Sequence, residues 1–174
     1  GIWNTDHFNF DGKFYQFKDY TLRPQPLPDK PVEIFQGGSS RAARDMASRV
    51  SDWYFTNGNT PEELKKQIDD IREKARANNH TVKIGVNAFI IARDTEEQAK
   101  AVLQEIIDKA NIKAVKNFAE ATREAGASTT EGEGNWAKSS FEDLVQYNDG
   151  FKTNLIGTPQ QIAERIVVLK NIGV

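Results

Sequence analysis

An alternation of short apolar runs with amphipathic helical stretches, between residues 32 and 124, constrains the fold of this chain more than any other feature. The runs lie at 32–35, 52–57 and 82–92, and after each of them apolar residues recur at helical spacing. Strands that alternate with helices form a parallel sheet with right-handed crossover connections. The pattern therefore predicts an α/β fold.

Capping residues mark where the helices begin. Threonine followed by proline predicts a helix start at 60–61 and again at 158–159, because threonine caps a helix and proline suits its first position. Thr95 is expected to cap another helix, which ends near Ala110 or continues to Phe118. The predicted buried face of the helix that begins at 60–61 consists of Leu64, Ile68, Ile71 and Ala75.

The remaining segments do not follow this alternation. Residues 8–20 alternate aromatic and polar positions around Asp11-Gly12, which predicts a β-hairpin with a two-residue turn. Four of the six prolines follow within residues 21–31, which we expect to be an extended connector. Residues 125–157 are rich in Gly, Ser, Thr and Asn, and a loop of this length in a domain is usually functional or disordered.

The predicted strands are too few to close a (β/α)8 barrel, which needs roughly 250 residues. We expect the C-terminal portion of such a barrel, truncated at both ends, because the chain opens without Met and stops after a helix. The expected partial barrel, residues 1–174, consists of a hairpin and connector (1–31), three β-α units (32–124), a lid-like insertion (125–157) and a last helix (158–174).

Composition excludes several classes of function. The net charge is −2, from 23 basic and 25 acidic residues, which argues against electrostatic binding of nucleic acid or of a membrane surface. Cysteine is absent, so neither a disulfide framework nor a cysteine-ligated zinc is expected. The sequence has no apolar run long enough to span a bilayer and no signal-peptide pattern, and we expect a cytoplasmic protein.

A glycine and serine turn is the first candidate site. Gly37, Gly38, Ser39 and Ser40 join an apolar run to a predicted helix, and Arg41 adds a positive charge. A helix N-terminus offers unpaired N–H groups to an anion, and glycines let the anion approach the backbone. The same residues also suit a tight turn with a serine cap, and the turn alone does not decide between these interpretations.

A second group of candidates follows the next two predicted strands. Thr56, Asn57 and Asn59 come at the carboxyl end of a strand, where barrel active sites are built, although an ordinary core position suits this segment equally well. Asn87 is polar within an apolar run and needs a partner if it is buried; an inward-facing pocket position would supply one.

Self-contained catalytic chemistry is not visible in the sequence. His7 and His80 are isolated, and we interpret His7 as structural and His80 as a surface turn residue. The acidic pairs at 62–63 and 96–97 lie in first helical turns, which the helix dipole favours. Without a nucleophile, a metal site or an acid–base pair, an enzyme of this sequence requires a cofactor for its chemistry.

The stretches "FDGKFYQFKDYTLRPQPLP" and "EIFQGGSSRAARDMASRVSDWYFTNGNTPEELKKQIDDIREKA" resemble the bacterial luciferase-like flavin monooxygenases. The stretches "KIGVNAFIIARDTEEQAKAVL", "EGEGNWAKSSFEDLVQYNDGF" and "LIGTPQQIAERI" extend the resemblance over nearly the whole chain. The resemblance implies a (β/α)8 barrel that binds FMNH2, supplied by an NAD(P)H-dependent flavin reductase, and uses O2 to cleave a C–S bond in a small organosulfur substrate. It places the FMN phosphate at Gly37, Gly38, Ser39 and Ser40.

The resemblance also implies a substrate and a lid. Alkanesulfonate-oxidising members of the family carry Arg-x-His where this chain has Asn87 and Phe89, so a neutral substrate is expected here, namely dimethyl sulfone converted to methanesulfinate and formaldehyde. The insertion at 125–157 matches a mobile lid that shields the flavin from water. The candidate lid aromatics are Trp136, Phe141, Tyr147 and Phe151.

Three alternatives remain open from the sequence. They are an alkanesulfonate monooxygenase, a deazaflavin-dependent oxidoreductase of the same superfamily, and a non-catalytic half-barrel that self-associates. Because an open sheet edge invites pairing, we expect a homo-oligomer. The isolated chain is not expected to be a competent monooxygenase.

Overall fold

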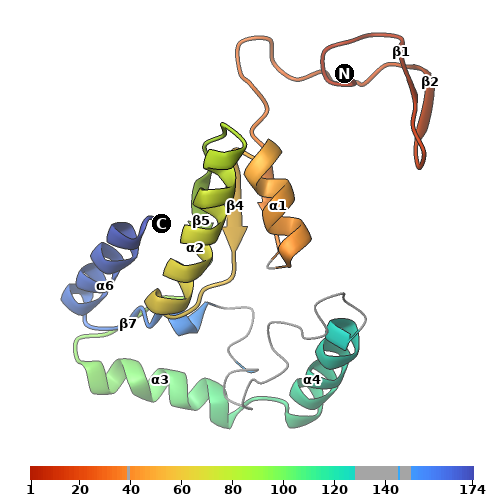
Figure 1. The fold of residues 1–174 in the computed structure, drawn as a ribbon. Coiled ribbons are helices and arrows are strands. Elements are labelled where there is room, and N and C mark those ends of the chain that lie inside the picture. The colour runs from red at the N-terminus through yellow and green to blue at the C-terminus, as the bar shows by residue number, and fades with distance from the viewer. Residues whose placement is uncertain (39, 128–144, 146–149) are drawn as a thin grey trace. The chain divides into compact units, whose positions relative to one another are not determined.

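The computed structural model describes residues 1–38, 40–127, 145 and 150–174, and it divides into two compact units (Figure 1). One unit comprises Gly1–Glu33 and the other Ile34–Val174. Among the described residues, no helix combines the length and the apolar character needed to cross a membrane.

The first unit contains the predicted β-hairpin, formed by β1 (Phe8–Asp11) and β2 (Gln16–Tyr20) in antiparallel pairing. The predicted two-residue turn is wrong, because Asp11 pairs with Gln16 and the loop therefore spans residues 12–15. The Gly12 N–H donates to the Tyr15 carbonyl oxygen at 3.0 Å and closes this wider loop. Asp-Gly thus stands at the end of a strand and not at the centre of the turn.

Polar contacts hold the ends of the hairpin. The His7 imidazole lies 2.6 Å from the Asp19 carboxylate through Nδ1, which supports the structural interpretation of this histidine. The Arg23 guanidinium donates to the Asp6 carboxylate at 2.9 Å and lowers the pKa of that carboxyl. Both pairs are largely exposed to solvent, so we expect each to contribute little to stability.

The second unit is built around a three-stranded parallel sheet of order β3-β4-β5. Its strands are β3 (Phe35–Gly37), β4 (Trp53–Thr56) and β5 (Lys83–Val86). The crossover helices α1 (Arg41–Val50) and α2 (Pro61–Ala77) pack against each other. Both helices were predicted, whereas β3 begins three residues later than the predicted run at 32–35.

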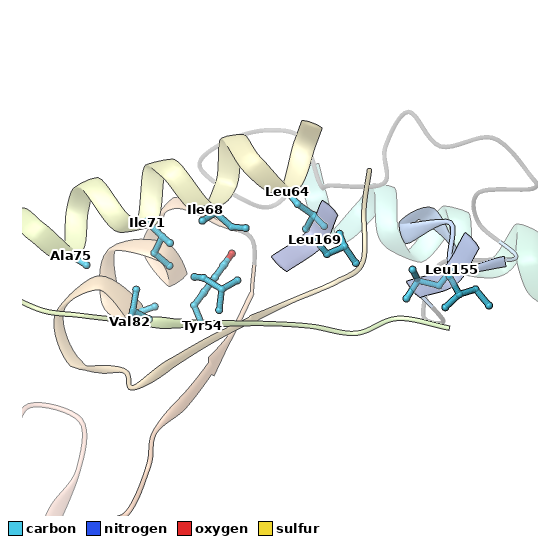
Figure 2. Close-up of a cluster of buried hydrophobic side chains, with 11 residues drawn as sticks. Tyr54, Leu64, Ile68, Ile71, Ala75, Val82, Leu155 and Leu169 are labelled. Carbon is cyan, nitrogen blue, oxygen red and sulfur yellow. The ribbon is translucent and has the colours of Figure 1, made fainter. Parts of the chain in front are cut away.

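One face of this sheet and the buried stripe of α2 form the main hydrophobic core (Figure 2). Side chains alternate along β4, so Tyr54 faces the core while Trp53 and Phe55 face the opposite side of the sheet. The predicted buried face of α2 is confirmed, since all four of its residues are almost fully buried. The core consists of Ala47, Tyr54, Leu64, Ile68, Ile71, Ala75, Val82, Ile84, Leu155, Ile162 and Leu169.

A salt-bridge network joins α1 to α2. The Arg44 guanidinium donates to the Asp70 carboxylate at 2.7 Å, and Lys74 pairs with the same carboxylate and, at 3.7 Å, with Asp45. Partial burial alone would raise the pKa of Asp70, but the hydrogen bonds from Lys74 and Arg44 outweigh it and lower that pKa. The network links α1 to α2 along their contact.

The single strand predicted at 82–92 is wrong. The chain leaves the sheet after Val86, and a second parallel pair forms from β6 (Ile91–Ala92) and β7 (Ile156–Gly157). The reason is a close approach of another segment at the break: a Cβ atom on Gly150 would lie 2.5 Å from the Asn87 carbonyl oxygen.

The remaining helices all follow β6 in sequence. They are α3 (Glu96–Asp108), α4 (Ile112–Ala127), the short 3₁₀ helix η1 (Phe151–Thr153) and α6 (Pro159–Ile172). α3 ends close to the predicted Ala110 and does not continue to Phe118, because Asn111 starts a new helix by accepting from the Ala114 N–H at 3.0 Å. α6 begins where predicted, and reciprocal bonds between Thr158 and Gln161 form a capping box at its start.

We predict that Ile68→Ala lowers the free energy of unfolding by about 2–5 kcal/mol, because it leaves a cavity in the main core. Ile68 is 1% exposed, whereas Ile166 on α6 is 45% exposed. Ile166→Ala is therefore the matched control and is expected to cost well under about 1 kcal/mol. Urea unfolding of the full-length protein measures both, and equal losses would contradict this assignment of the core.

Candidate functional site

The carboxyl ends of β3, β4 and β5 meet at one edge of the sheet, because the three strands are parallel and in register. Gly37 pairs with Phe55, and Phe55 pairs with Gly85. The loops that follow the strands thus leave the same edge. We call residues 37–41, 57–60 and 87–90 the strand-end loops.

The first strand-end loop is a glycine turn that enters α1. Gly38 has φ +110°, a left-handed conformation that side chains other than glycine rarely adopt, and a Cβ atom there would lie 3.0 Å from the Ala43 Cβ. Ser40 caps the helix, as one of the two interpretations predicted, by accepting from the Ala43 N–H at 3.2 Å. Gly37, Gly38 and Ser40 are exposed, and Ser39 lies outside the described residues.

The charge at the start of α1 differs from that at the start of α2. The first turn of α1 contains no acidic residue, whereas α2 begins with Glu62 and Glu63. The side chain of Arg41 is 78% exposed, and its Nε lies 3.9 Å from the Asp45 carboxylate one turn further on. The partial positive charge of the helix N-terminus is therefore not offset by a carboxylate in the first turn.

A buried hydrogen-bond chain lies behind this turn. The Tyr54 hydroxyl donates to the Gly38 carbonyl oxygen at 2.8 Å, and it accepts from Gln67 Nε2 at 2.8 Å. The Thr56 hydroxyl donates to Gln67 Oε1 at 3.2 Å. We call Thr56, Gln67, Tyr54 and Gly38 the hydroxyl relay.

The hydroxyl relay defines the roles of two residues of β4, Thr56 and Tyr54. Thr56 is the last residue of β4, but it is buried and its hydroxyl donates to Gln67 on α2, so its side chain faces the helix and not the open edge of the sheet. The sequence did not single out Tyr54 as a site residue, because an aromatic residue in an apolar strand normally indicates core packing. One sequence feature could have pointed to Tyr54: residues two apart in a strand face the same side, so Tyr54 and Thr56 share a face.

Asn87 is part of a junction between three segments. Its side-chain Oδ1 accepts from the Gly58 N–H at 2.5 Å, and its own N–H donates to the Thr56 carbonyl oxygen at 3.2 Å. A Cβ atom on Gly58 would lie 2.6 Å from the Asn87 carbonyl oxygen and 2.9 Å from the Gly150 Cα. The predicted need of Asn87 for a partner is met by backbone, and the second and third strand-end loops are tied together.

Two of the predicted aromatic residues meet beside this junction. The rings of Phe89 and Phe151 lie 4.5 Å apart between centroids, with 42° between their planes. Phe151 is buried, whereas Phe89 is 41% exposed and presents apolar surface at the strand-end loops. Trp136, Phe141 and Tyr147 lie outside the described residues.

The other polar candidates have local roles. Asn57 is half-buried at the end of β4, and Asn59 accepts from the Thr60 N–H at 2.9 Å where α2 begins. His80 lies in the predicted turn between helix and strand, but it is half-buried, with Nε2 2.8 Å from the Ser51 carbonyl oxygen. In the part of the chain that the structure describes, no cluster of His, Cys, Asp and Glu residues is suited to a metal ion.

Comparison with known proteins gives a match over the entire chain. Residues 1–174 match the family model of the luciferase-like monooxygenases. A curated relative, the FMNH2-dependent dimethylsulfone monooxygenase of Pseudomonas putida, is 72% identical over all 174 residues. The chain spans about half the length of this relative, 48%.

Solved structures share the fold at low sequence identity. Riboflavin lyase RcaE, determined with modified FMN and riboflavin, has a TM-score of 0.69 at 21% identity over 95% of this chain and 42% of its own. DmoA from Hyphomicrobium sulfonivorans has a TM-score of 0.63 at 20% identity over 99% of this chain and 41% of its own. Together with the parallel strands that alternate with helices, these matches confirm the predicted partial (β/α)8 barrel.

We predict that Gly58→Ala destabilises the protein by about 2 kcal/mol or more, because the new methyl group would overlap the Asn87 carbonyl oxygen and force the junction apart. Gly37→Ala is the matched control, since its nearest neighbour, the Phe55 carbonyl oxygen, is 3.8 Å from the added Cβ. Thermal unfolding of both full-length variants checks the difference. Similar melting temperatures would show that the junction tolerates displacement.

Proposed function

Because the chain belongs to the luciferase-like monooxygenase family, we propose that it is part of an FMNH2- and O2-dependent monooxygenase that acts on dimethyl sulfone. The observation that carries the proposal is the 72% identity to a dimethylsulfone monooxygenase, which extends over every section of the chain. The balanced reaction is dimethyl sulfone, O2 and FMNH2 to methanesulfinic acid, formaldehyde, water and FMN. One C–S bond breaks, and the flavin supplies two electrons.

In this proposal the glycine turn binds the FMN phosphate. The described residues suit an anion, because the α1 N-terminus has no acidic residue in its first turn and a Cβ at Gly38 would crowd Ala43. Ser39 belongs to the proposed site on sequence grounds, with Gly37, Gly38, Ser40 and Arg41. When bound, the reduced flavin supplies the chemistry that activates O2.

The second and third strand-end loops form the proposed substrate wall. Phe89 offers an apolar surface that rests on the buried ring of Phe151, and Asn87 brings no charge to it. A neutral sulfone is compatible with such a wall, whereas a sulfonate would lose hydration without gaining a cation there. Asn57 remains a proposed pocket residue, while the burial of Thr56 makes it a support behind the turn.

The proposal extends to the lid, the flavin reductase and the oligomeric state. The predicted lid at 125–157 is too long at its C-terminal end, because Phe151, a predicted lid residue, is buried and β7 is paired with β6. In this proposal the lid aromatics are Trp136, Phe141 and Tyr147, which exclude water from the flavin. An NAD(P)H-dependent flavin reductase provides FMNH2 in the cytoplasm. From the sequence we further propose that the protein is a homo-oligomer.

The test is turnover by the full-length protein with FMN, NADH and an active flavin reductase. We expect formaldehyde and methanesulfinate in equal amounts from dimethyl sulfone, and no sulfite from an alkanesulfonate. Sulfite release without dimethyl sulfone turnover would replace the proposed substrate with a sulfonate. Binding of a deazaflavin in preference to FMN would overturn the cofactor.

We also predict that Gly38→Val weakens FMN binding at least tenfold, because a β-branched residue does not adopt φ +110° and the turn must rearrange. Ser39→Ala is expected to have a smaller effect in the same direction. Flavin fluorescence titration measures both affinities, and circular dichroism verifies folding. Unchanged affinity in a folded Gly38→Val variant would remove the turn from the FMN site.

A further inference from the structure

We propose that Tyr54 is a positioning residue for the phosphate of FMN, and that it acts by holding the Gly38 carbonyl oxygen away from the bound anion. The inference rests on the proposed FMN site at the glycine turn. It adds a residue that has no exposed surface and therefore lies behind the proposed site.

The glycine turn needs an external constraint. Glycine adopts many backbone conformations at similar free energy, so the peptide group that follows Gly38 has more than one accessible orientation. A carbonyl oxygen carries partial negative charge and repels a phosphate. If the Gly38 carbonyl turned outward, it would place that charge beside the proposed anion site at the start of α1.

Tyr54 supplies the constraint from inside the protein. It comes from β4, is 0% exposed, and donates its hydroxyl proton to the Gly38 carbonyl oxygen at 2.8 Å. Burial raises the pKa of the Tyr54 hydroxyl, which therefore stays protonated and remains a donor near neutral pH. With the carbonyl fixed inward, the α1 N-terminus presents N–H dipoles to the anion.

The rest of the relay fixes the direction of that proton. A tyrosine hydroxyl has one proton, and because Gln67 Nε2 donates to its oxygen at 2.8 Å, the proton is directed elsewhere, to Gly38. Gln67 keeps this orientation because its Oε1 accepts from the Thr56 hydroxyl at 3.2 Å. Each member thus donates to the next, from the end of β4 to the glycine turn.

The experiment compares FMN with riboflavin, which has the same ring system but no phosphate. In the full-length protein, Tyr54→Phe removes the hydroxyl and keeps the ring in the core. We expect FMN binding to weaken about five- to tenfold, the range for loss of one buried hydrogen bond. Riboflavin affinity is expected to stay within about twofold, because the constraint acts only on the phosphate site.

Two further variants separate positioning from general stability. Ser48→Ala is the matched control: Ser48 is a 1% exposed residue on α1 whose hydroxyl donates to the Asp45 carbonyl oxygen at 2.8 Å. It should leave the FMN-to-riboflavin affinity ratio unchanged. Gln67→Met breaks the relay one step earlier, so we expect it to lower the FMN-to-riboflavin affinity ratio, though less than Tyr54→Phe does. Because this variant keeps the tyrosine, a lowered ratio supports the inference even if Tyr54→Phe does not fold.

The outcomes distinguish the inference from the proposed site. A wild-type protein that binds FMN no more tightly than riboflavin would overturn the phosphate site and this inference with it. A wild-type preference for FMN that persists in folded Tyr54→Phe and Gln67→Met variants would overturn the inference alone. Equal weakening of both flavins would also overturn it, since that result indicates a general structural role.

Discussion

The parallel pairing of β4 with β3 on one side and β5 on the other is the constraint on which the proposed site depends. It brings three carboxyl strand ends to one edge of the sheet, so loops that are distant in sequence become neighbours. It also fixes which side chains of β4 face the helices. Because faces alternate along a strand, Tyr54 and Thr56 lie under α2, while Phe55 lies on the opposite face.

Core and site are therefore continuous in this unit. Tyr54 contributes its ring to the hydrophobic core and its hydroxyl to the glycine turn, so the packing that stabilises the sheet also restrains the turn. The junction of Asn87 with Gly58 and Gly150 does the same for the other two strand-end loops. Buried polar groups at the rim of a core must find partners, and here the partners belong to the loops.

Local sequence signals predicted much of this architecture. Caps and apolar spacing located α1, α2 and α6 because these signals act within one or two turns of a helix. The break at Asn87 was not predictable, since it depends on Gly58, which is 29 residues away in sequence, and on the approach of Gly150. The role of Tyr54 was missed for the same reason, because its partner Gly38 is 16 residues away and its aromatic ring alone accounts for burial.

A crystal structure of the full-length protein with bound FMN tests the central claim most directly, namely that the glycine turn and the α1 N-terminus hold the cofactor phosphate. We expect a phosphate oxygen within hydrogen-bonding distance of backbone N–H groups in residues 38–41, with the Gly38 carbonyl oxygen still bonded to the Tyr54 hydroxyl. A phosphate bound to another part of the protein, with no contact to this turn, would contradict the account.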